Sequence, residues 1–389
     1  MKDLIKNKKY SEMPFSICLS LITFLQGLII YKNANLWDYG QHTNVAKYLL
    51  VHEIEWDSFK NAKHAIVYPM YHILIKLIHL AGKIDYKFSI AALMIVCNIA
   101  SIIIIRNLIK LYTKDNSYLM DFLSIFTIVF IAARGPLTHW RYYIFITGPN
   151  PIHNPTFILV RPLGLLCFYY FCKFFTEYRS DKKVGNKNLI GFGIFALLSV
   201  AAKPSFAVVY LPAMGLYTLV TMIKNKDIFI GIRTFLAVLP TLVTLIWQQR
   251  YMSSNSTMLG VEFHFGSFSD LSVADVLMAT IAFMPSALIL INFEKLKSNV
   301  YYLVAWMATI IGWLQFYFLD NGNSGDFSWG YAFSLEVIAF ISLAQAQADF
   351  KEYKYGKTRL VIAWIAFFYQ CVMGLLYLYK IYKFGEYWI

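Results

Sequence analysis

The stretch YPMYHILIKLIHLAG, at residues 68–82, decides how the chain is arranged, because it is the apolar run whose place is ambiguous. Three polar side chains, His72, Lys76 and His79, share one face of a helix at this spacing, with leucines and isoleucines opposite. This division is typical of an interfacial helix that lies on a membrane surface. We therefore predict a surface helix here, not a spanning one.

Longer apolar runs flank this stretch on both sides. The 389 residues are 58% hydrophobic and 15% charged, with a mean hydropathy of +0.53, whereas a soluble domain carries roughly a quarter charged residues. Many runs approach the ~20 residues needed to cross a bilayer. They lie at about 14–31, 88–108, 118–133, 156–175, 189–202, 205–222, 228–247, 273–292, 300–319, 331–347 and 359–380. The pattern predicts an all-α polytopic membrane protein that forms a single integral domain, 1–389.

Positive charges decide how many runs span the membrane. If 68–82 spans, the basic segment at 106–114 lies outside and every later loop inverts. If 68–82 lies on the surface, the basic clusters gather on one side, which the positive-inside rule assigns to the cytoplasm. We therefore predict about 11 spans, a cytoplasmic N-terminus and a first extracytoplasmic loop at 32–87 with juxtamembrane helices. The net charge of +13 then reflects topology, and no nucleic acid partner is implied.

Several other features exclude classes of protein. The first apolar run lacks a small-residue cleavage site, so we expect a retained span and not a signal peptide. The five cysteines lie inside apolar runs without metal-ligand spacing, and no P-loop or dinucleotide fingerprint occurs. The halves are not inverted copies, which disfavours a secondary transporter. The composition, with its short loops, suits a multi-pass protein of the bacterial inner membrane.

Asp38 is the first candidate catalytic residue. It follows Trp37 in NLWDYGQH, directly after the first span, and tryptophan is an expected interfacial anchor. A carboxylate near the membrane surface and within reach of a hydroxyl can serve as a general base. The alternative, a solvated carboxylate capping a helix that starts near Thr43, stays open. His42, on the same outer side, is a candidate substrate contact.

Two basic residues are candidates for binding a lipid phosphate. Lys203 lies in the short turn of SVAAKPSFAVVYLP, and Arg161 lies about one turn inside the span that starts near Thr156. Arginine costs roughly 2.5–3.5 kcal/mol at mid-depth, so it is normally paired or lines a polar cavity. A phosphate headgroup would suit the two cations together. Snorkelling of Lys203 to water is the alternative. Glu336, inside a later span, is predicted to pair with one of them.

Two further outer loops carry candidate substrate-binding residues. Loop 134–155, RGPLTHWRYYIFITGPNPIHNP, supplies Arg141, His153 and Asn154, and suits a sugar or a headgroup. A structural plug is its alternative.

Loop 320–330, DNGNSGDFSWG, supplies Asp326 and Trp329, which are typical of a carbohydrate contact, with a plain turn as the alternative. Tyr68, at the head of the surface helix, is a further candidate substrate contact.

No cofactor is certain from the sequence. A divalent metal, Mg or Mn, is an open alternative, with His153 and either Asp38 or His42 as its candidate ligands, and a carboxylate is the group of these that suits such ions. No residue spacing supports it, so we assign no metal ligand.

The order of these parts resembles the GT-C superfamily, the polytopic transferases that use polyprenyl-phosphate-linked sugars. In layout the chain looks most like aminoarabinose transferases and protein O-mannosyltransferases. The shared parts cover most of residues 14–215: a first span, an acid opening a long outer loop (WDYGQHTNVAKYLL), a YP-led surface helix, a basic inner end (RNLIKLY) and a KP turn (AAKPSFAVVYLP). The chain has Asp38-Tyr39 where many members have Asp-Glu or Asp-x-Asp.

The resemblance implies an inverting glycosyl transfer on the extracytoplasmic face. The donor lipid would lie between spans with its phosphate near Lys203 and Arg161. Asp38 would take the proton of an acceptor hydroxyl as that hydroxyl attacks the anomeric carbon, and the cations would stabilise the departing phosphate. The implied partners are a polyprenyl-phosphate-linked sugar, a glycan, lipid or protein acceptor, and membrane lipids.

Three other functions compete with this interpretation. A polysaccharide polymerase of the O-antigen or capsule type would also need outer arginines and histidines, but the acid in the first loop favours the transferase. A lipid-linked sugar flippase needs two-sided access and polar residues deep in several spans. A non-enzymatic membrane scaffold would tolerate Asp38→Ala.

Overall fold

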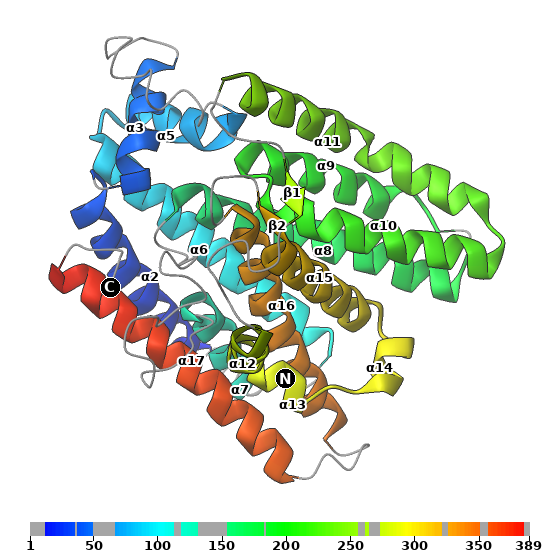
Figure 1. Ribbon diagram of the computed structural model, residues 1–389. Helices are drawn as coiled ribbons and strands as arrows, with labels where there is room; N and C mark the ends of the chain where they lie inside the picture. Colours follow the sequence, from blue (N-terminus) through cyan, green and yellow to red (C-terminus); the bar gives the residue numbers. More distant parts are fainter. Residues whose placement is uncertain are drawn as a thin grey trace, which may run out of the picture.

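The computed structural model describes most of the chain and is helical almost throughout (Figure 1). The described residues are 12–35, 37–49, 67–112, 118–130, 154–182, 184–255, 261–263, 273–320, 326–350 and 357–384. The elements are α2 (Met13–Asn33), α3 (Trp37–Tyr48), α5 (Pro69–Gly82), α6 (Tyr86–Lys110), α7 (Tyr118–Phe126), η2 (Thr127–Val129), α8 (Pro155–Ser180), α9 (Lys187–Ala202), α10 (Ser205–Asn225), α11 (Ile228–Asn255), β1 (Glu262–Phe263), α12 (Val273–Phe283), α13 (Pro285–Ile289), α14 (Phe293–Ser298), α15 (Val300–Phe318), β2 (Leu319–Asp320), α16 (Asp326–Asp349) and α17 (Lys357–Phe384).

Eight helices in this part of the chain are long and apolar enough to cross a membrane. They are α2, α6, α8, α10, α11, α15, α16 and α17. Helices suit this role because each satisfies its own backbone hydrogen bonds where water is absent. The predicted all-α polytopic architecture is therefore confirmed.

Three of the predicted spans are not among these eight long helices. The run at 118–133 is described only to residue 130 and forms the short apolar helical segment Tyr118–Val129, and helix α9, with 16 residues, is shorter than the ~20 residues of a typical span. The run at 273–292 is two helices and not one. Met284 separates α12 from α13 with φ −128° and ψ 42°, because Pro285 lacks an N–H and disfavours a helical conformation in the residue before it.

Helices α8 and α16 lie in the middle of the bundle. Helix α8 packs against α6 and α9, and α16 packs against α10 and α15. Helices α9, α10 and α11 form one side of the molecule, while α2 and α17, the first and last helices drawn, lie together on the other side (Figure 1). Helices α3 and α5 sit together at one end of the bundle.

Helix α5 forms where the sequence predicts it, over 14 residues, but its polar face turns into the protein. His72 and Lys76 are fully buried, and Lys76 Nζ donates to Tyr86 Oη at 2.9 Å. Ile73 and Leu77 lie on the exposed side. This inverted amphipathic pattern fits a helix whose outer surface meets an apolar medium.

A short antiparallel ribbon joins two of the predicted outer loops. Glu262 pairs with Asp320, and Phe263 pairs with Leu319. The ribbon ties the segment after α11 to the connection between α15 and α16.

Candidate functional site

Asp38 lies in the first turn of α3 and is held by a residue far away in the sequence. Asn154 Nδ2 donates to Asp38 Oδ2 at 2.8 Å. Helix α3 begins at Trp37, so Asp38 does not cap a helix starting near Thr43. A carboxylate in the first turn of a helix is favoured by the helix dipole.

Asn154 is itself fixed, because it is the N-cap of α8. Its Oδ1 accepts from the backbone N–H of Phe157 at 3.1 Å and from Thr156 Oγ1 at 2.5 Å. An Asn at this position satisfies a backbone donor that the helix leaves unpaired. One amide therefore caps α8 with its oxygen and orients the Asp38 carboxylate with its nitrogen.

Lys203 lies near two aromatic rings. Its Nζ is 4.9 Å from the ring centroid of Trp329 and 5.9 Å from that of Tyr68. Lys203 ends α9 in extended backbone, Trp329 lies in the first turn of α16, and Tyr68 directly precedes α5. A cation beside aromatic faces is attracted by their ring electrons, and this attraction grows as water is removed. Lys203 and Trp329 are both buried.

Phe157 joins the two halves of this site. Its ring centroid lies 5.2 Å from that of Trp329, and its backbone N–H is capped by Asn154. The contacts therefore run continuously from Asp38 through Asn154, Phe157 and Trp329 to Lys203. We call these five residues and Tyr68 the outer site.

Arg161 and Glu336 form a buried ion pair next to the outer site. Arg161 Nη2 lies 2.9 Å from Glu336 Oε2, and Arg161 is completely buried. This is one of the two predicted pairings of Glu336. Arg161 Nε and Nη1 have no hydrogen-bond partner among the described residues. The charge of Arg161 is therefore opposed by Glu336, and the pair links α8 to α16.

His42 contacts His72 of α5. His42 Nδ1 and His72 Nε2 are 2.8 Å apart, and Tyr71 packs edge-on against both imidazole rings. His72 is fully buried, and burial lowers its pKa from 6.5 to about 3. The His72 ring is therefore neutral at physiological pH.

Sequence reasoning missed two residues that place the outer site. Gln248 Nε2 donates to the backbone carbonyls of Val67 at 2.8 Å and Val200 at 3.1 Å, which fixes the chain just before Tyr68 and near the end of α9. A glutamine within an apolar run is a weak signal of such a clamp, because a buried amide requires partners.

Gly330 is the second missed residue. A Cβ atom there would lie 2.5 Å from the Ser205 carbonyl oxygen and 2.4 Å from Val209 Cγ2. The start of α16 can therefore approach α10 this closely only at a glycine. This approach sets Trp329 beside Lys203.

The side chains of three other predicted residues are not described. Arg141 and His153 lie outside the described residues, and Asp326 begins α16 without a described side chain. Within the described residues, no group of three His, Cys, Asp or Glu side chains could hold a metal ion. The metal ligation suggested for His153 stays a prediction.

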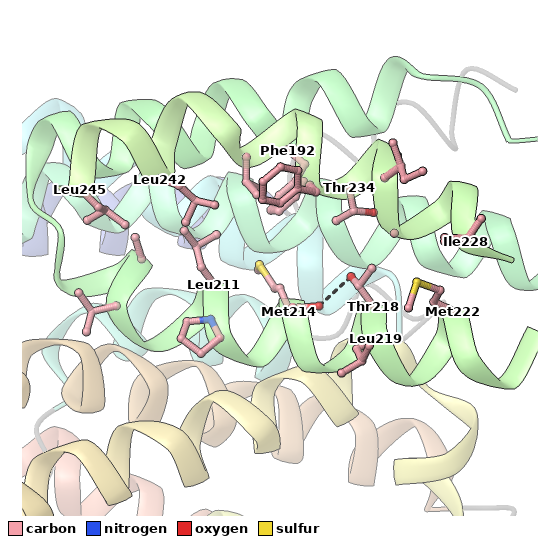
Figure 2. A pocket seen from close by; sticks show the side chains of 18 residues that line it. Phe192, Leu211, Met214, Thr218, Leu219, Met222, Ile228, Thr234, Leu242 and Leu245 are labelled. Atoms are coloured by element: carbon pink, nitrogen blue, oxygen red, sulfur yellow. Dashed lines mark hydrogen bonds between the residues drawn. The ribbon is translucent and has the colours of Figure 1, made fainter. Parts of the chain in front are cut away.

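An apolar cavity of about 670 Å³ lies between α10 and α11 and is closed at the back by Phe192 of α9 (Figure 2). Its α10 wall runs from Ala207, one turn beyond Lys203, to Met222. Its two threonines direct their hydroxyls to their own helices: Thr218 donates to the Met214 carbonyl, as Figure 2 shows, and Thr234 to that of Ile230. The cavity therefore offers an almost wholly apolar lining along the height of the bundle.

Comparison with protein-family models finds no match to the chain, and no curated protein is similar to it. The case for a function therefore rests on the geometry of the outer site and the cavity.

Proposed function

We propose that the protein is a membrane glycosyltransferase. It transfers a sugar from a polyprenyl-phosphate donor to a glycan, lipid or protein acceptor, with inversion, at the extracytoplasmic face of a bacterial inner membrane. In this proposal the chain crosses the membrane about 11 times, with its N-terminus in the cytoplasm. The observation that carries the proposal is the continuous set of contacts that joins the anchored carboxylate of Asp38 to Lys203 at one end of the bundle.

Asp38 is the proposed general base. A base must be held in one orientation within hydrogen-bond reach of the attacking hydroxyl. The hydrogen bond from Asn154 to Oδ2 restricts the orientation of the carboxylate. The Asp38 carboxylate is the group that we propose accepts the proton as the hydroxyl oxygen bonds to the anomeric carbon.

Lys203 is the proposed phosphate contact, and its two aromatic neighbours are the proposed sugar contacts. The bond from the anomeric carbon to the phosphate oxygen breaks with its electron pair going to the phosphate, whose added charge Lys203 stabilises. Trp329 and Tyr68 offer flat apolar faces near this amine. Arg161, with Glu336, holds α8 against α16 behind them.

The apolar cavity supports a donor that carries a long hydrocarbon chain. Its wall begins one helical turn beyond Lys203, so a lipid whose phosphate contacts Lys203 can place its chain along α10 and α11. Burying one CH₂ group away from water contributes about 0.8 kcal/mol to binding. A lipid chain that enters the cavity from the bilayer does not leave water, so van der Waals packing against the cavity wall favours its binding instead.

The test is release of polyprenyl phosphate by purified protein that is given a polyprenyl-phosphate sugar and membrane extract of its host. We compare wild type with Asp38→Asn and with a matched control, Asp85→Asn. Asp85 caps α6 through Phe88 N–H, and Asn caps equally well, so the control changes an exposed acid without losing a helix cap. We expect Asp38→Asn to lower release by about 10²–10⁴-fold and Asp85→Asn to leave it unchanged.

Other outcomes would redirect the assignment. Equal release by wild type and Asp38→Asn would refute the role of Asp38. Chain growth from diphosphate-linked oligosaccharides, without release from any monosaccharide donor, would indicate a polysaccharide polymerase. Movement of labelled lipid-linked sugar across vesicles without transfer would indicate a flippase.

A further inference from the structure

Gln248 joins a wall of the apolar cavity to two other segments of the chain. Leu242 and Leu245 of α11 line the cavity and point into it (Figure 2). Gln248 follows Leu245 by three residues, so the two side chains are neighbours on the surface of α11. Gln248 is buried, and its Nε2 atom donates to the backbone carbonyls of Val67 at 2.8 Å and Val200 at 3.1 Å. Carbonyl oxygens can only accept, so the amide nitrogen must face them.

The carbonyl of Val200 depends on this side chain. Val200 lies in the last turn of α9, three residues before Lys203. In a continuous helix its carbonyl would accept from the backbone of residue 204, but Pro204 has no N–H. Gln248 supplies the donor that the proline removes. The end of α9, from which Lys203 follows, is therefore held to α11.

The carbonyl of Val67 brings a second part of the outer site to the same amide. Val67 directly precedes Tyr68, whose ring centroid lies 5.9 Å from Lys203 Nζ. One side chain of α11 therefore holds the backbone beside both Tyr68 and Lys203.

Helix α11 itself has little packing to hold it. Only 17% of its apolar span is buried inside the protein, the lowest fraction among the eight long helices of the described chain. Its inner end is fixed by Arg233, whose Nη2 atom donates to the Val184 carbonyl at 2.8 Å and to Asn186 Oδ1 at 2.7 Å. A helix with few buried contacts is more easily displaced than the central helices. A hydrocarbon chain in the cavity adds contacts to α11 and restricts it between its two ends.

We propose that Gln248 is a positioning residue through which the hydrocarbon chain of the donor sets the positions of Lys203 and Tyr68. A chain that fills the cavity restricts α11, and the Gln248 amide passes this restriction to the segments that carry the two residues. The inference rests on the proposed glycosyl transfer and names the part of the donor that controls its rate.

In this scheme the chain contributes to the rate of transfer as well as to binding. Binding energy from a remote part of a substrate raises kcat when it orders the groups around the reacting centre. A donor with a short chain should therefore react with a lower kcat and a higher KM. A cavity that only binds the chain would change KM alone.

The first arm of the test needs no reaction. Protein in lipid nanodiscs is given polyprenol, the chain without its phosphate, and backbone hydrogen exchange is followed by mass spectrometry. In wild type we expect slower exchange in peptides of α10 and α11 and, several-fold, in peptides that contain Tyr68 or Lys203. In Gln248→Leu only the α10 and α11 peptides should keep this protection. Inorganic phosphate, which lacks the chain, should affect the Lys203 peptides equally in both proteins.

The second arm measures kcat and KM for a long polyprenyl donor and for a donor of two isoprene units. In wild type we expect kcat to be about tenfold higher with the long donor, the value of one hydrogen bond. Gln248→Leu and Gln248→Glu, which has the same shape but no N–H when ionised, should bring this kcat ratio close to one and keep the KM ratio. Arg233→Met is the matched control, because it removes the contacts of α11 at the end remote from Lys203. It should keep the kcat ratio of wild type.

The outcomes separate this inference from the proposed function. Equal protection of the Tyr68 and Lys203 peptides in wild type and Gln248→Leu would overturn the inference, as would a kcat ratio that survives both substitutions of Gln248. The expected protection in a protein that releases no polyprenyl phosphate would refute the glycosyl transfer and leave the role of Gln248 standing. Absence of protection in α10 and α11 would refute this inference and the place given to the donor chain. If Gln248→Leu fails to fold, Gln248→Glu serves in both arms.

Discussion

Asn154 links the stability of α8 to the orientation of Asp38, and two substitutions separate these roles. Its Oδ1 caps the helix, and its Nδ2 donates to Asp38. A serine is long enough to cap but too short to reach Asp38 as well. We therefore expect Asn154→Ser to keep the cap and lose the Asp38 contact, and Asn154→Ala to lose both.

The magnitudes follow from the two contacts. An N-cap contributes about 1 kcal/mol, and a hydrogen bond to a charged group about 1.5–3 kcal/mol, the lower end applying here because Asp38 is partly exposed. Asn154→Ser should lower the free energy of unfolding by about 1.5 kcal/mol, and Asn154→Ala by about 2.5 kcal/mol. Loss of the carboxylate orientation should reduce polyprenyl phosphate release by about 10–100-fold in both variants.

Unfolding is followed by tryptophan fluorescence as SDS is added to mixed micelles, and release is measured on the same preparations. The matched control is Asn292→Ser, because Asn292 caps the remote helix α14 with the same side-chain oxygen. That variant should keep full release. Full release by Asn154→Ser would refute the orienting role of Asn154, and equal stability losses for Ser and Ala would refute its role as a cap.

Three further predictions concern the buried pair, the cavity and pH. Arg161→Met or Glu336→Leu alone should destabilise by about 3–5 kcal/mol by leaving an unpaired buried charge, while the double variant should recover much of that loss in the same SDS titration. A Cβ at Gly215, in the cavity wall, has no neighbour within 4 Å, so the backbone there accepts a side chain. Gly215→Phe should therefore occupy part of the cavity and raise donor KM several-fold, while Gly185→Phe, whose Cβ is equally uncrowded but lies outside the cavity, should not. Unfolded His72 binds a proton below its ordinary pKa of 6.5, whereas folded His72 does so only at about 3. Stability should therefore fall by about 1.4 kcal/mol per pH unit as pH drops through this window, a slope that His72→Gln should lose in thermal unfolding curves. An unchanged donor KM in Gly215→Phe would contradict the role of the cavity. Additive stability losses for Arg161→Met and Glu336→Leu would contradict the buried pair, and an unchanged pH slope in His72→Gln would contradict the argument from pKa.

Local patterns predicted several candidate residues whose contacts the structure then described. Three charged residues stand out in this apolar chain. They are an acid after an interfacial tryptophan, a lysine before a proline in a short turn, and an arginine inside a span. Such signals identify Asp38, Lys203 and Arg161 because charge near lipid is costly. Gln248 and Gly330 carry no comparable signal, since their roles depend on the backbone of another segment.

The sequence by itself determined the helical, membrane-spanning character of the chain. That property depends on apolar length, and on backbone hydrogen bonds that close within each segment. Continuity of the run at 273–292 was a weaker inference, because a single proline broke it.

Only the tertiary structure decided which polar groups meet. Asp38 and Asn154 are 116 residues apart, and Arg161 of α8 pairs with Glu336 of α16. The sequence also did not determine that the polar face of α5 turns into the protein. Pairing of this kind depends on helix packing, and packing is set by the shapes of side chains from distant segments, which no local pattern contains.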